Sequence, residues 1–162
     1  MNPDGEDQRP LLQRTGREGD LRWSPDGERL AFSSAPADQP DRQELLVVDR
    51  DGGEPEELGP GFGAAWPPDG EGLAYSRPPT ADGTGDVDIF LITLDDGEPR
   101  PLSQSITYDR WPTWSPDGGR LAYSALVDEG TAFICVVQLE PEDRDCLDLG
   151  DLLPTAPAWS PQ

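Results

Sequence analysis

A motif that recurs about every 45 residues limits the folds open to this chain more than any other feature. The motif is Trp-x-Pro-Asp-Gly, and a Leu-Ala-aromatic-Ser segment follows each of its first three copies. The copies begin at Trp23, Trp66, Trp114 and, for a fourth that is cut short, Trp159. Chance does not align the same positions in three copies, so the chain is built from repeated structural units.

Each unit predicts four short antiparallel strands. The first strand ends at the tryptophan. Pro-Asp-Gly then forms a tight turn, because proline fixes φ, aspartate bonds back to nearby backbone N–H groups and glycine accepts positive φ. The Leu-Ala-aromatic segment is the second strand, and an apolar run such as Leu45–Val48 or Ile89–Leu94 is the third. A short fourth strand is expected near Leu58, Leu102 and Leu149.

The repeat residues are therefore explained by architecture before any chemistry is invoked. They are Trp23, Pro25, Asp26, Gly27, Trp66, Asp69, Gly70, Trp114, Pro116, Asp117, Gly118 and Trp159. The second copy has Pro67 where the first and third have serine. This change should weaken one turn hydrogen bond and leave the corner intact.

No stretch predicts a capped amphipathic helix of useful length, so the expected fold is all-β. Four strands in about 40–50 residues match one blade of a β-propeller. We expect a partial β-propeller with three complete four-stranded blades, at residues 19–58, 62–103 and 110–149. Residues 1–12 read as the last strand of a preceding blade, and residues 155–162 as the first strand of a following blade.

Trp-Ser-Pro-Asp-Gly, followed by Leu-Ala-Phe/Tyr-Ser, an Ile/Val-rich strand and Asp-Gly, resembles the TolB-type (WD-like) β-propeller repeat. The resemblance covers essentially the whole chain and implies the fold. It implies little about activity, because the matching residues are architectural. Proteins of this type serve as docking platforms for other proteins, often outside the cytoplasm. The resemblance thus implies a protein partner and an extracytoplasmic, periplasmic place in a bacterium.

Three blades do not close a ring, because propellers usually have about 4–8 blades. The chain is therefore expected to be a segment of a longer propeller, which we favour, or half of a ring completed by a second copy, or an open arc. The first residues, Met1–Gly5, lack the charged and apolar stretches of a signal peptide.

Composition excludes several functions. The formal net charge is -21, with 33 acidic residues against 12 basic ones, so phosphate backbones are repelled and nucleic acid is not expected as a partner. The chain has no histidine, which excludes a Ser-His-Asp triad and a histidine-ligated metal site. No apolar run approaches the length of about 20 residues that a membrane span needs.

The densest acidic cluster is the loop that contains Asp82, Asp86 and Asp88. Oxygen ligands at alternate positions suit Ca²⁺, but the loop lacks the glycine and distal glutamate of an EF-hand. A solvated acidic loop is the favoured interpretation, with calcium as a weak alternative. No other cofactor is expected.

The segment Tyr108-Asp109-Arg110-Trp111 is the interaction candidate. It precedes the third motif, on a loop that enters a blade's first strand. In a TolB-like propeller that strand lines the central channel, so the loop would lie at a channel mouth. Tyr108, Arg110 and Trp111 are residue types enriched at binding hot spots. The competing interpretation, which we favour from the sequence, is that Trp111 packs on Trp114 or on the neighbouring blade.

The two cysteines, Cys135 and Cys146, lie in the third and fourth strands of the last full blade. A cross-strand disulfide is possible if they face one another, and a shift of one residue in register would prevent it. Catalysis by cysteine is not expected, because no histidine or lysine is present to lower the thiol pKa.

We expect a non-enzymatic interaction platform. Prolyl-oligopeptidase-type peptidases carry a similar propeller as a gate over a separate α/β-hydrolase domain, so a gating propeller is the alternative. That alternative requires a Gly-x-Ser-x-Gly segment with its Asp and His partners, which these residues do not contain. A calcium-binding or glycan-binding propeller is a third option.

Overall fold

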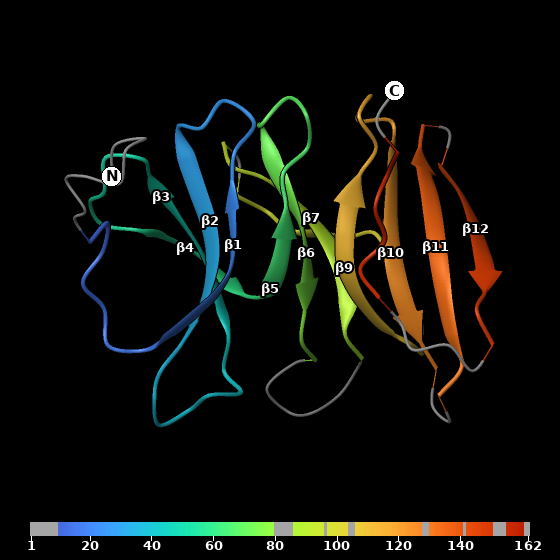
Figure 1. Ribbon diagram of the computed structural model, residues 1–162, viewed down its shortest axis with the longest axis horizontal. Coiled ribbons are helices and arrows are strands. Elements are labelled where there is room, and N and C mark those ends of the chain that lie inside the picture. Colours follow the sequence, from blue (N-terminus) through green and yellow to red (C-terminus); the bar gives the residue numbers. More distant parts are fainter. Residues whose placement is uncertain are drawn as a thin grey trace.

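The computed structural model describes residues 10–79, 86–95, 97–103, 106–127, 130–140, 142–150 and 155–160. These residues form three four-stranded antiparallel sheets that stand side by side, each twisted like the blade of a propeller (Figure 1). The first blade contains β1 (Arg17–Trp23), β2 (Arg29–Ala35), β3 (Glu44–Asp49) and β4 (Glu56–Pro60). The second contains β5 (Phe62–Ala65), β6 (Gly72–Arg77), β7 (Asp88–Thr93) and β8 (Arg100–Pro101). The third contains β9 (Tyr108–Trp114), β10 (Arg120–Leu126), β11 (Ala132–Leu139) and β12 (Glu142–Asp148).

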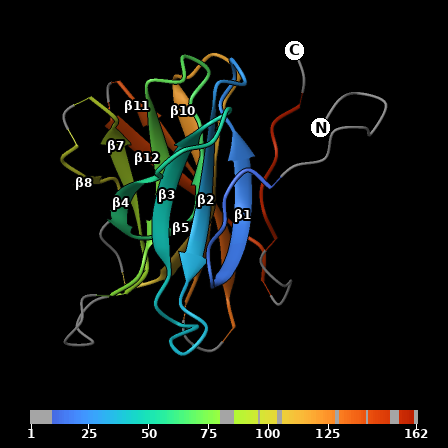
Figure 2. The ribbon, with the colours of Figure 1, turned by 90° about the vertical axis from the view of Figure 1, so that its left-hand side faces the viewer.

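Strand order follows chain order in every blade, so the expected all-β fold with three four-stranded blades is confirmed. The first strand of each unit (β1, β5 or β9) forms one edge of its sheet, and the fourth strand forms the other. Figure 2, turned by 90°, shows β1 on one side of the molecule and β4 and β8 on the opposite side. We call β1, β5 and β9 the inner strands.

The Pro-Asp-Gly turns explain why the first two strands of each blade pair. The N–H of Gly27 donates to the carbonyl of Ser24, and the same bond joins Gly118 to Ser115, each at 2.9 Å. In the second blade, the N–H of Gly70 donates to the carbonyl of Pro67 at 3.0 Å, so the corner survives the loss of serine. The three glycines have φ of 73°, 72° and 71°, a conformation that glycine adopts without strain.

The hydrophobic core lies between blades. Tyr75 of the second blade packs towards Leu45 and Val47 of the first, and Tyr123 of the third packs towards Ile89 and Leu91 of the second. The Leu and aromatic residue of each Leu-Ala-aromatic segment face the preceding blade, while the alanine faces the following one, because side chains alternate across a strand. One sheet cannot cover both of its faces alone, and this explains the repetition.

The segments that flank the three blades lie against them. Leu11 and Leu12 pack on the cluster of Leu30, Phe32 and neighbours that covers the first face of the first blade. Residues 155–160 form no strand, but the indole N–H of Trp159 donates to the carbonyl of Thr113 at 3.1 Å. No helix in the described part of the chain is long and apolar enough to cross a membrane.

Candidate functional site

Exposed large hydrophobic side chains concentrate on the inner strands. Among the described residues there are six: Leu21 and Trp23 in β1, Ile106 just before β9, Tyr108 and Trp111 in β9, and Leu147 in β12. Five of these six therefore belong to the inner strands or to the residues leading into them. Apolar groups gathered on one face of a protein mark an interaction site more often than scattered ones do.

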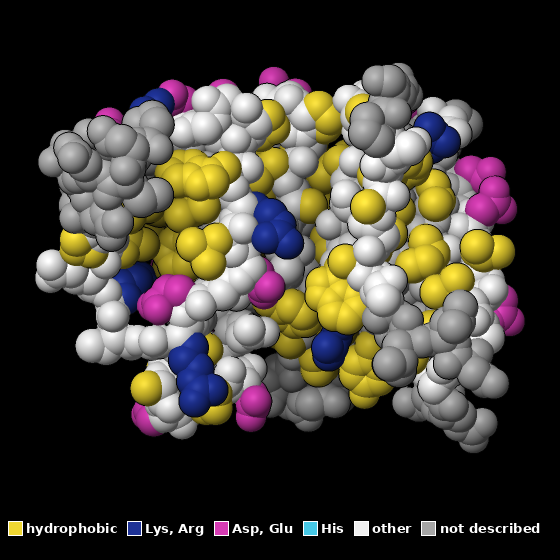
Figure 3. Space-filling view, viewed as in Figure 1, with side chains coloured by type: hydrophobic (Ala, Val, Ile, Leu, Met, Phe, Trp, Pro, Cys, Tyr) yellow, Lys and Arg dark blue, Asp and Glu magenta, His cyan; other side chains and the backbone are white. Residues whose placement is uncertain are grey.

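Charged side chains are also unevenly distributed on the surface of this face. Figure 3 presents the face on which β1 lies in front of β3 and β4, and hydrophobic side chains with a few arginines occupy much of it. Acidic side chains lie mainly towards its edges, although the chain has 33 of them. This face is thus less acidic and more apolar than the net charge of -21 suggests.

The residues Tyr108, Arg110 and Trp111 come together at one hollow on this face. With Ser124 and Leu126 of β10 they line a hollow of about 260 Å³. Tyr108 and Trp111 are 39% and 38% exposed, so neither is absorbed into the packing between blades. The three residues belong to β9 itself, because the strand starts at Tyr108, and not to a loop before it.

Arg110 is held by an aromatic ring of the neighbouring blade. Its guanidinium lies over the ring of Phe62 in β5, at 5.6 Å from the centroid. In the part of the chain that the structure describes, Arg110 has no carboxylate within ion-pair distance. Its charge is therefore presented towards the hollow without a described counter-ion.

A second hollow, of about 350 Å³, crosses all three inner strands and reaches residues 156 and 157. Trp111 lines both hollows. The rings of Trp23, Trp66 and Trp114 also line the second hollow, which gives it an aromatic rim. We call this second hollow the inner-strand hollow.

A β-bulge repeated in each blade shapes the inner-strand hollow. The register of the inner strand shifts between Gly19 and Arg22 in the first blade, and equivalent shifts occur in the other two. The residue three positions before each motif tryptophan adopts a left-handed conformation: Asp20 at φ 53°, Gly63 at 62° and Trp111 at 56°. Such a bulge redirects a side chain out of the regular alternation.

Trp111 was a candidate from the sequence because of its residue type, whereas Asp20 and Gly63 were not identified. The signal that could have found them is positional, because both stand three residues before a motif tryptophan. Aspartate and glycine are also residues that tolerate a left-handed backbone. Tryptophan is not such a residue, so its strained conformation is held by the surrounding structure.

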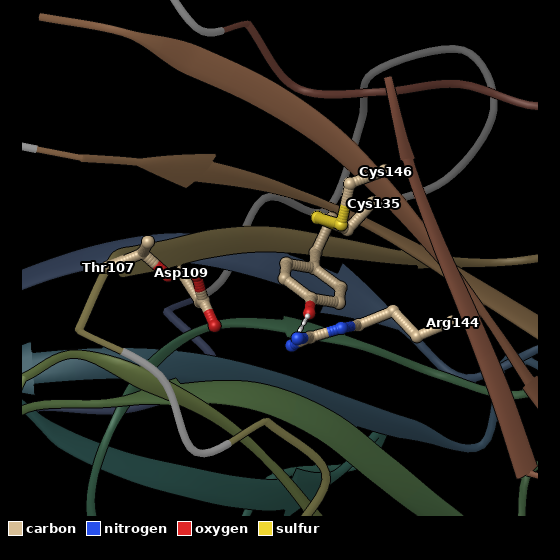
Figure 4. The surroundings of a disulfide bond; sticks show 6 residues. Thr107, Asp109, Cys135, Arg144 and Cys146 are labelled. Carbon is tan, nitrogen blue, oxygen red and sulfur yellow. Dashed lines mark hydrogen bonds between the residues drawn. A yellow bond between two sulfur atoms is a disulfide. The ribbon is translucent and has the colours of Figure 1, made fainter. Parts of the chain in front are cut away.

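Beneath the site, Asp109 is fully buried between two exposed neighbours. Its backbone N–H donates to the carbonyl of Val87 at 2.7 Å, and the hydroxyl of Thr107 donates to its carboxylate. Figure 4 shows Asp109 and Arg144 pointing towards one another. A buried carboxylate needs such polar surroundings, because desolvation disfavours its charge.

Tyr123 completes this buried cluster. Its hydroxyl accepts a hydrogen bond from Nη1 of Arg144 at 3.5 Å. Burial raises the pKa of Tyr123, and the negative charge of Asp109 raises it further. The hydrogen bond to Tyr123 in turn raises the pKa of Arg144, so the guanidinium stays charged beside the buried carboxylate.

Cys135 and Cys146 form a disulfide that ties β12 to β11. Their Cα atoms are 4.0 Å apart, and the two residues are direct partners in the antiparallel register. Of the two registers that the sequence left open, the structure has the one that allows the bond. Because Arg144 lies two residues before Cys146 on the same face of β12, the disulfide also helps to hold Arg144 within hydrogen-bond distance of Tyr123.

The calcium candidate is only partly covered by the structure. Asp82 lies outside the described residues, while Asp88 opens β7 and accepts a hydrogen bond from the hydroxyl of Ser103 at 3.4 Å. Within the described ranges, no group of three or more acidic or cysteine side chains is placed to hold a metal ion. A calcium site that includes Asp82 stays a prediction.

The turn aspartates have partners of their own. The hydroxyl of Ser24 donates to Asp26, and that of Ser115 donates to Asp117. These hydrogen bonds, with a backbone N–H two residues on, lower the pKa of both carboxyl groups. The structure places these aspartates as stabilisers of the corners.

No protein-family model matches the chain, and no curated protein matches it. Solved structures do match. A puromycin-hydrolyzing peptidase of Mycobacterium tuberculosis aligns at 21% identity with a TM-score of 0.69, over 87% of this chain and 23% of its own. The β-propeller domain of the trilobed protease of Pyrococcus furiosus aligns at 16% identity and 0.66, over 83% of this chain and 43% of its own.

A TolB protein of Agrobacterium tumefaciens aligns at 19% identity with a TM-score of 0.58, over 85% of this chain and 64% of its own. The chain thus spans between 23% and 64% of the length of these three structures. At such identities the likeness concerns the fold, and it is a likeness to the β-propellers of TolB and of prolyl-oligopeptidase-type peptidases.

Proposed function

We propose that this chain is a non-enzymatic β-propeller module that binds a segment of another protein on its inner-strand face. The observation that carries the proposal is the placement of exposed hydrophobic side chains. Five of the six among the described residues lie on β1 and β9 or lead into β9, where Arg110 adds a charge. Tryptophan, tyrosine and arginine are enriched among the few residues that dominate binding in protein interfaces.

Site-specific photo-crosslinking tests this proposal. A photoreactive amino acid replaces Trp111 in one variant and Leu147 in a second. Leu147 is a suitable control because it is also exposed, at 67%, but lies on the outer strand β12. We expect discrete crosslinks to a partner protein from position 111 and none from position 147. Equal crosslinking from both positions would refute the proposal.

A second candidate function is the gating propeller of a prolyl-oligopeptidase-type peptidase. The observation that favours it is the structural comparison: the Mycobacterium tuberculosis peptidase aligns with a TM-score of 0.69, against 0.58 for the TolB protein of Agrobacterium tumefaciens. In that case the inner-strand face would line the path by which peptides reach a hydrolase domain.

The coding frame that surrounds this sequence separates the two candidates. A hydrolase domain with a Gly-x-Ser-x-Gly segment and its Asp and His partners favours the gate. Further Trp-Ser-Pro-Asp-Gly units without such a domain favour the platform. Association of the chain with itself, which the open arc of blades also allows, is measured by sedimentation velocity.

A further inference from the structure

The four positions that stand three residues before a motif tryptophan converge on one place. Asp20, Gly63, Trp111 and Ala156 come from different repeats, and all four line the inner-strand hollow of about 350 Å³. Three of them are known to lie in the left-handed region. The repeat therefore places one equivalent position from each unit at a shared space, and the residue at that position differs from unit to unit, with glycine in the second.

A serine of β2, β6 or β10 lies behind each bulge. The hydroxyl of Ser33 donates to Oδ2 of Asp20 at 3.2 Å, and that of Ser124 donates to the carbonyl of Thr155. The equivalent Ser76 is fully buried, and its hydroxyl has no hydrogen-bond partner among the described residues. A Cβ on Gly63 would lie 3.9 Å from that hydroxyl, so the second blade offers room and a polar atom where the first has a carboxylate.

The lining offers a cation one carboxylate and several tryptophans. Asp20 is the one carboxylate that lines the hollow among the described residues, and Trp23, Trp66, Trp111 and Trp114 surround it. Arg22 also lines the hollow, with its guanidinium hydrogen-bonded to the carbonyl of Leu21. A net charge of -21 attracts cationic partners over long range.

The chain already places arginines on tryptophans of this same motif. The guanidinium of Arg29 lies 5.2 Å from the centroid of Trp66, and that of Arg120 lies 5.0 Å from the centroid of Trp159. Trp23, the first tryptophan of the series, is 53% exposed and has no such arginine among the described residues. A cation that enters the hollow thus finds both a carboxylate and an unoccupied indole.

We infer that the inner-strand hollow binds an arginine or lysine side chain of the partner protein, with Asp20 as the counter-ion and Trp111 as the wall against its aliphatic stem. The inference rests on the proposed function, because it names the chemistry of the segment bound there. The bulge positions are then the specificity-determining positions of this face.

The test uses short peptides and fluorine NMR. The protein is labelled with 5-fluorotryptophan, and its five resonances are assigned by single Trp→Phe variants. Acetyl-Gly-Arg-Gly-amide is titrated against acetyl-Gly-Gln-Gly-amide, which has a similar size and no charge. We expect saturable shifts of the Trp111 and Trp23 resonances with the arginine peptide alone. Equal shifts with both peptides, or no shifts with either, would overturn the inference.

Two variants establish the role of Asp20. Asp20→Asn keeps the shape and tolerates the left-handed backbone, and it should weaken binding of the arginine peptide at least tenfold. Gly63→Asp repeats in the second blade the pairing of Asp20 with Ser33, so it should tighten binding severalfold. If Asp20→Asn binds as tightly as the unaltered protein, or Gly63→Asp folds and binds more weakly, the cation site is wrong.

The outcome is separable from that of the crosslinking experiment. Crosslinks from position 111 without binding of the arginine peptide would leave the platform standing and overturn the cation site. Binding of the arginine peptide together with equal crosslinking from positions 111 and 147 would support the cation site and overturn the platform.

Discussion

At the scale of single residues, the bulge in β9 places Trp111 in a backbone conformation that lowers the stability of the fold. Trp111 has φ 56°, which costs a non-glycine residue about 1–2 kcal/mol, and Gly63 occupies the equivalent position at no such cost. The structure keeps a tryptophan there despite this cost, and Trp111 lines both hollows of the inner-strand face.

Replacing Trp111 by glycine should therefore give a more stable protein than replacing it by alanine, by about 1 kcal/mol, because glycine relieves the left-handed strain. Chemical denaturation of the two variants measures the difference. Arg110 is the matched control: it is not among the described residues with positive φ, so its glycine variant should be the less stable of its pair. If the glycine variant is more stable than the alanine variant at both positions, or less stable at both, left-handed strain at Trp111 is not the explanation.

The turn aspartates should affect how the stability of the fold depends on pH in the acid range. The hydrogen bond from Ser115 lowers the pKa of Asp117 below its ordinary value of 3.8, so the folded protein binds this proton less readily than the unfolded chain. Its stabilising effect is full above pH 3.8 and is lost as the pH falls through the lower folded value.

Asp117→Asn should thus flatten the acid side of a curve of Tm against pH, measured by circular dichroism below about pH 5. Asp69→Asn is the control, because Pro67 stands where a serine hydroxyl would donate to Asp69. The variant at Asp69 should change the curve less. If Tm falls with pH in the same way for both variants, the hydrogen bond from Ser115 is not the cause of the acid dependence.

Single residues also show where sequence reasoning stops. The motif tryptophans and turn glycines were predictable because local turn chemistry dictates them. Trp111 was predictable as a candidate by residue type, but its exposure depends on a bulge that no local pattern announces. The burial of Asp109 beside Arg144 joins positions far apart in the chain, and contacts of that kind follow from the packing of strands.

At the scale of elements, β12 is held by its pairing with β11 and not by burial of its own side chains. Its described side chains, Asp143–Asp148, are all exposed, so burial of apolar surface contributes little to its position. The disulfide and seven register pairs with β11 hold it in place. The strand nevertheless carries Arg144, which reaches the buried cluster around Asp109 and Tyr123.

Removal of the disulfide should consequently act first on β12 and then on β9. The double variant Cys135→Ser, Cys146→Ser should lose about 2–4 kcal/mol of stability, the usual contribution of a disulfide. Hydrogen exchange measured by mass spectrometry should rise in residues 142–148 and in 108–111, while β2 and β3 keep their protection. A uniform rise across all blades would show that the bond stabilises the whole fold and not this edge.

The elements themselves were largely predictable. The repeated motif with its turn signal predicted a first strand that ends at the tryptophan, and β1 and β9 end there. The start of β9 was less accurately predicted, because Tyr108 and Arg110 are as typical of a loop as of a strand. That error matters, since a side chain on a paired strand is held more firmly than one on a loop.

At the scale of the whole molecule, the blades are joined by a series of tryptophan hydrogen bonds. The indole N–H of Trp66 donates to the carbonyl of Arg22 at 2.9 Å, and that of Trp114 donates to the carbonyl of Ala65 at 3.1 Å. Trp159 continues the series with Thr113. In each bond, the acceptor is the carbonyl of the residue that directly precedes the motif tryptophan of the previous unit. The same hydrogen bond therefore recurs at every junction between consecutive units.

This series predicts which tryptophans stabilise the stack. Trp114→Phe keeps an aromatic ring between the second and third blades and removes the N–H that reaches Ala65, so it should cost about 0.5–1.5 kcal/mol. Trp23→Phe should cost less, because Trp23 is 53% exposed and makes no such bond to a described residue. Stability in a repeat protein is approximately the sum of unit and interface contributions, so urea denaturation should report the Trp114 change as a loss at one interface. Equal losses for the two variants would mean that the ring, and not the indole hydrogen bond, joins the blades.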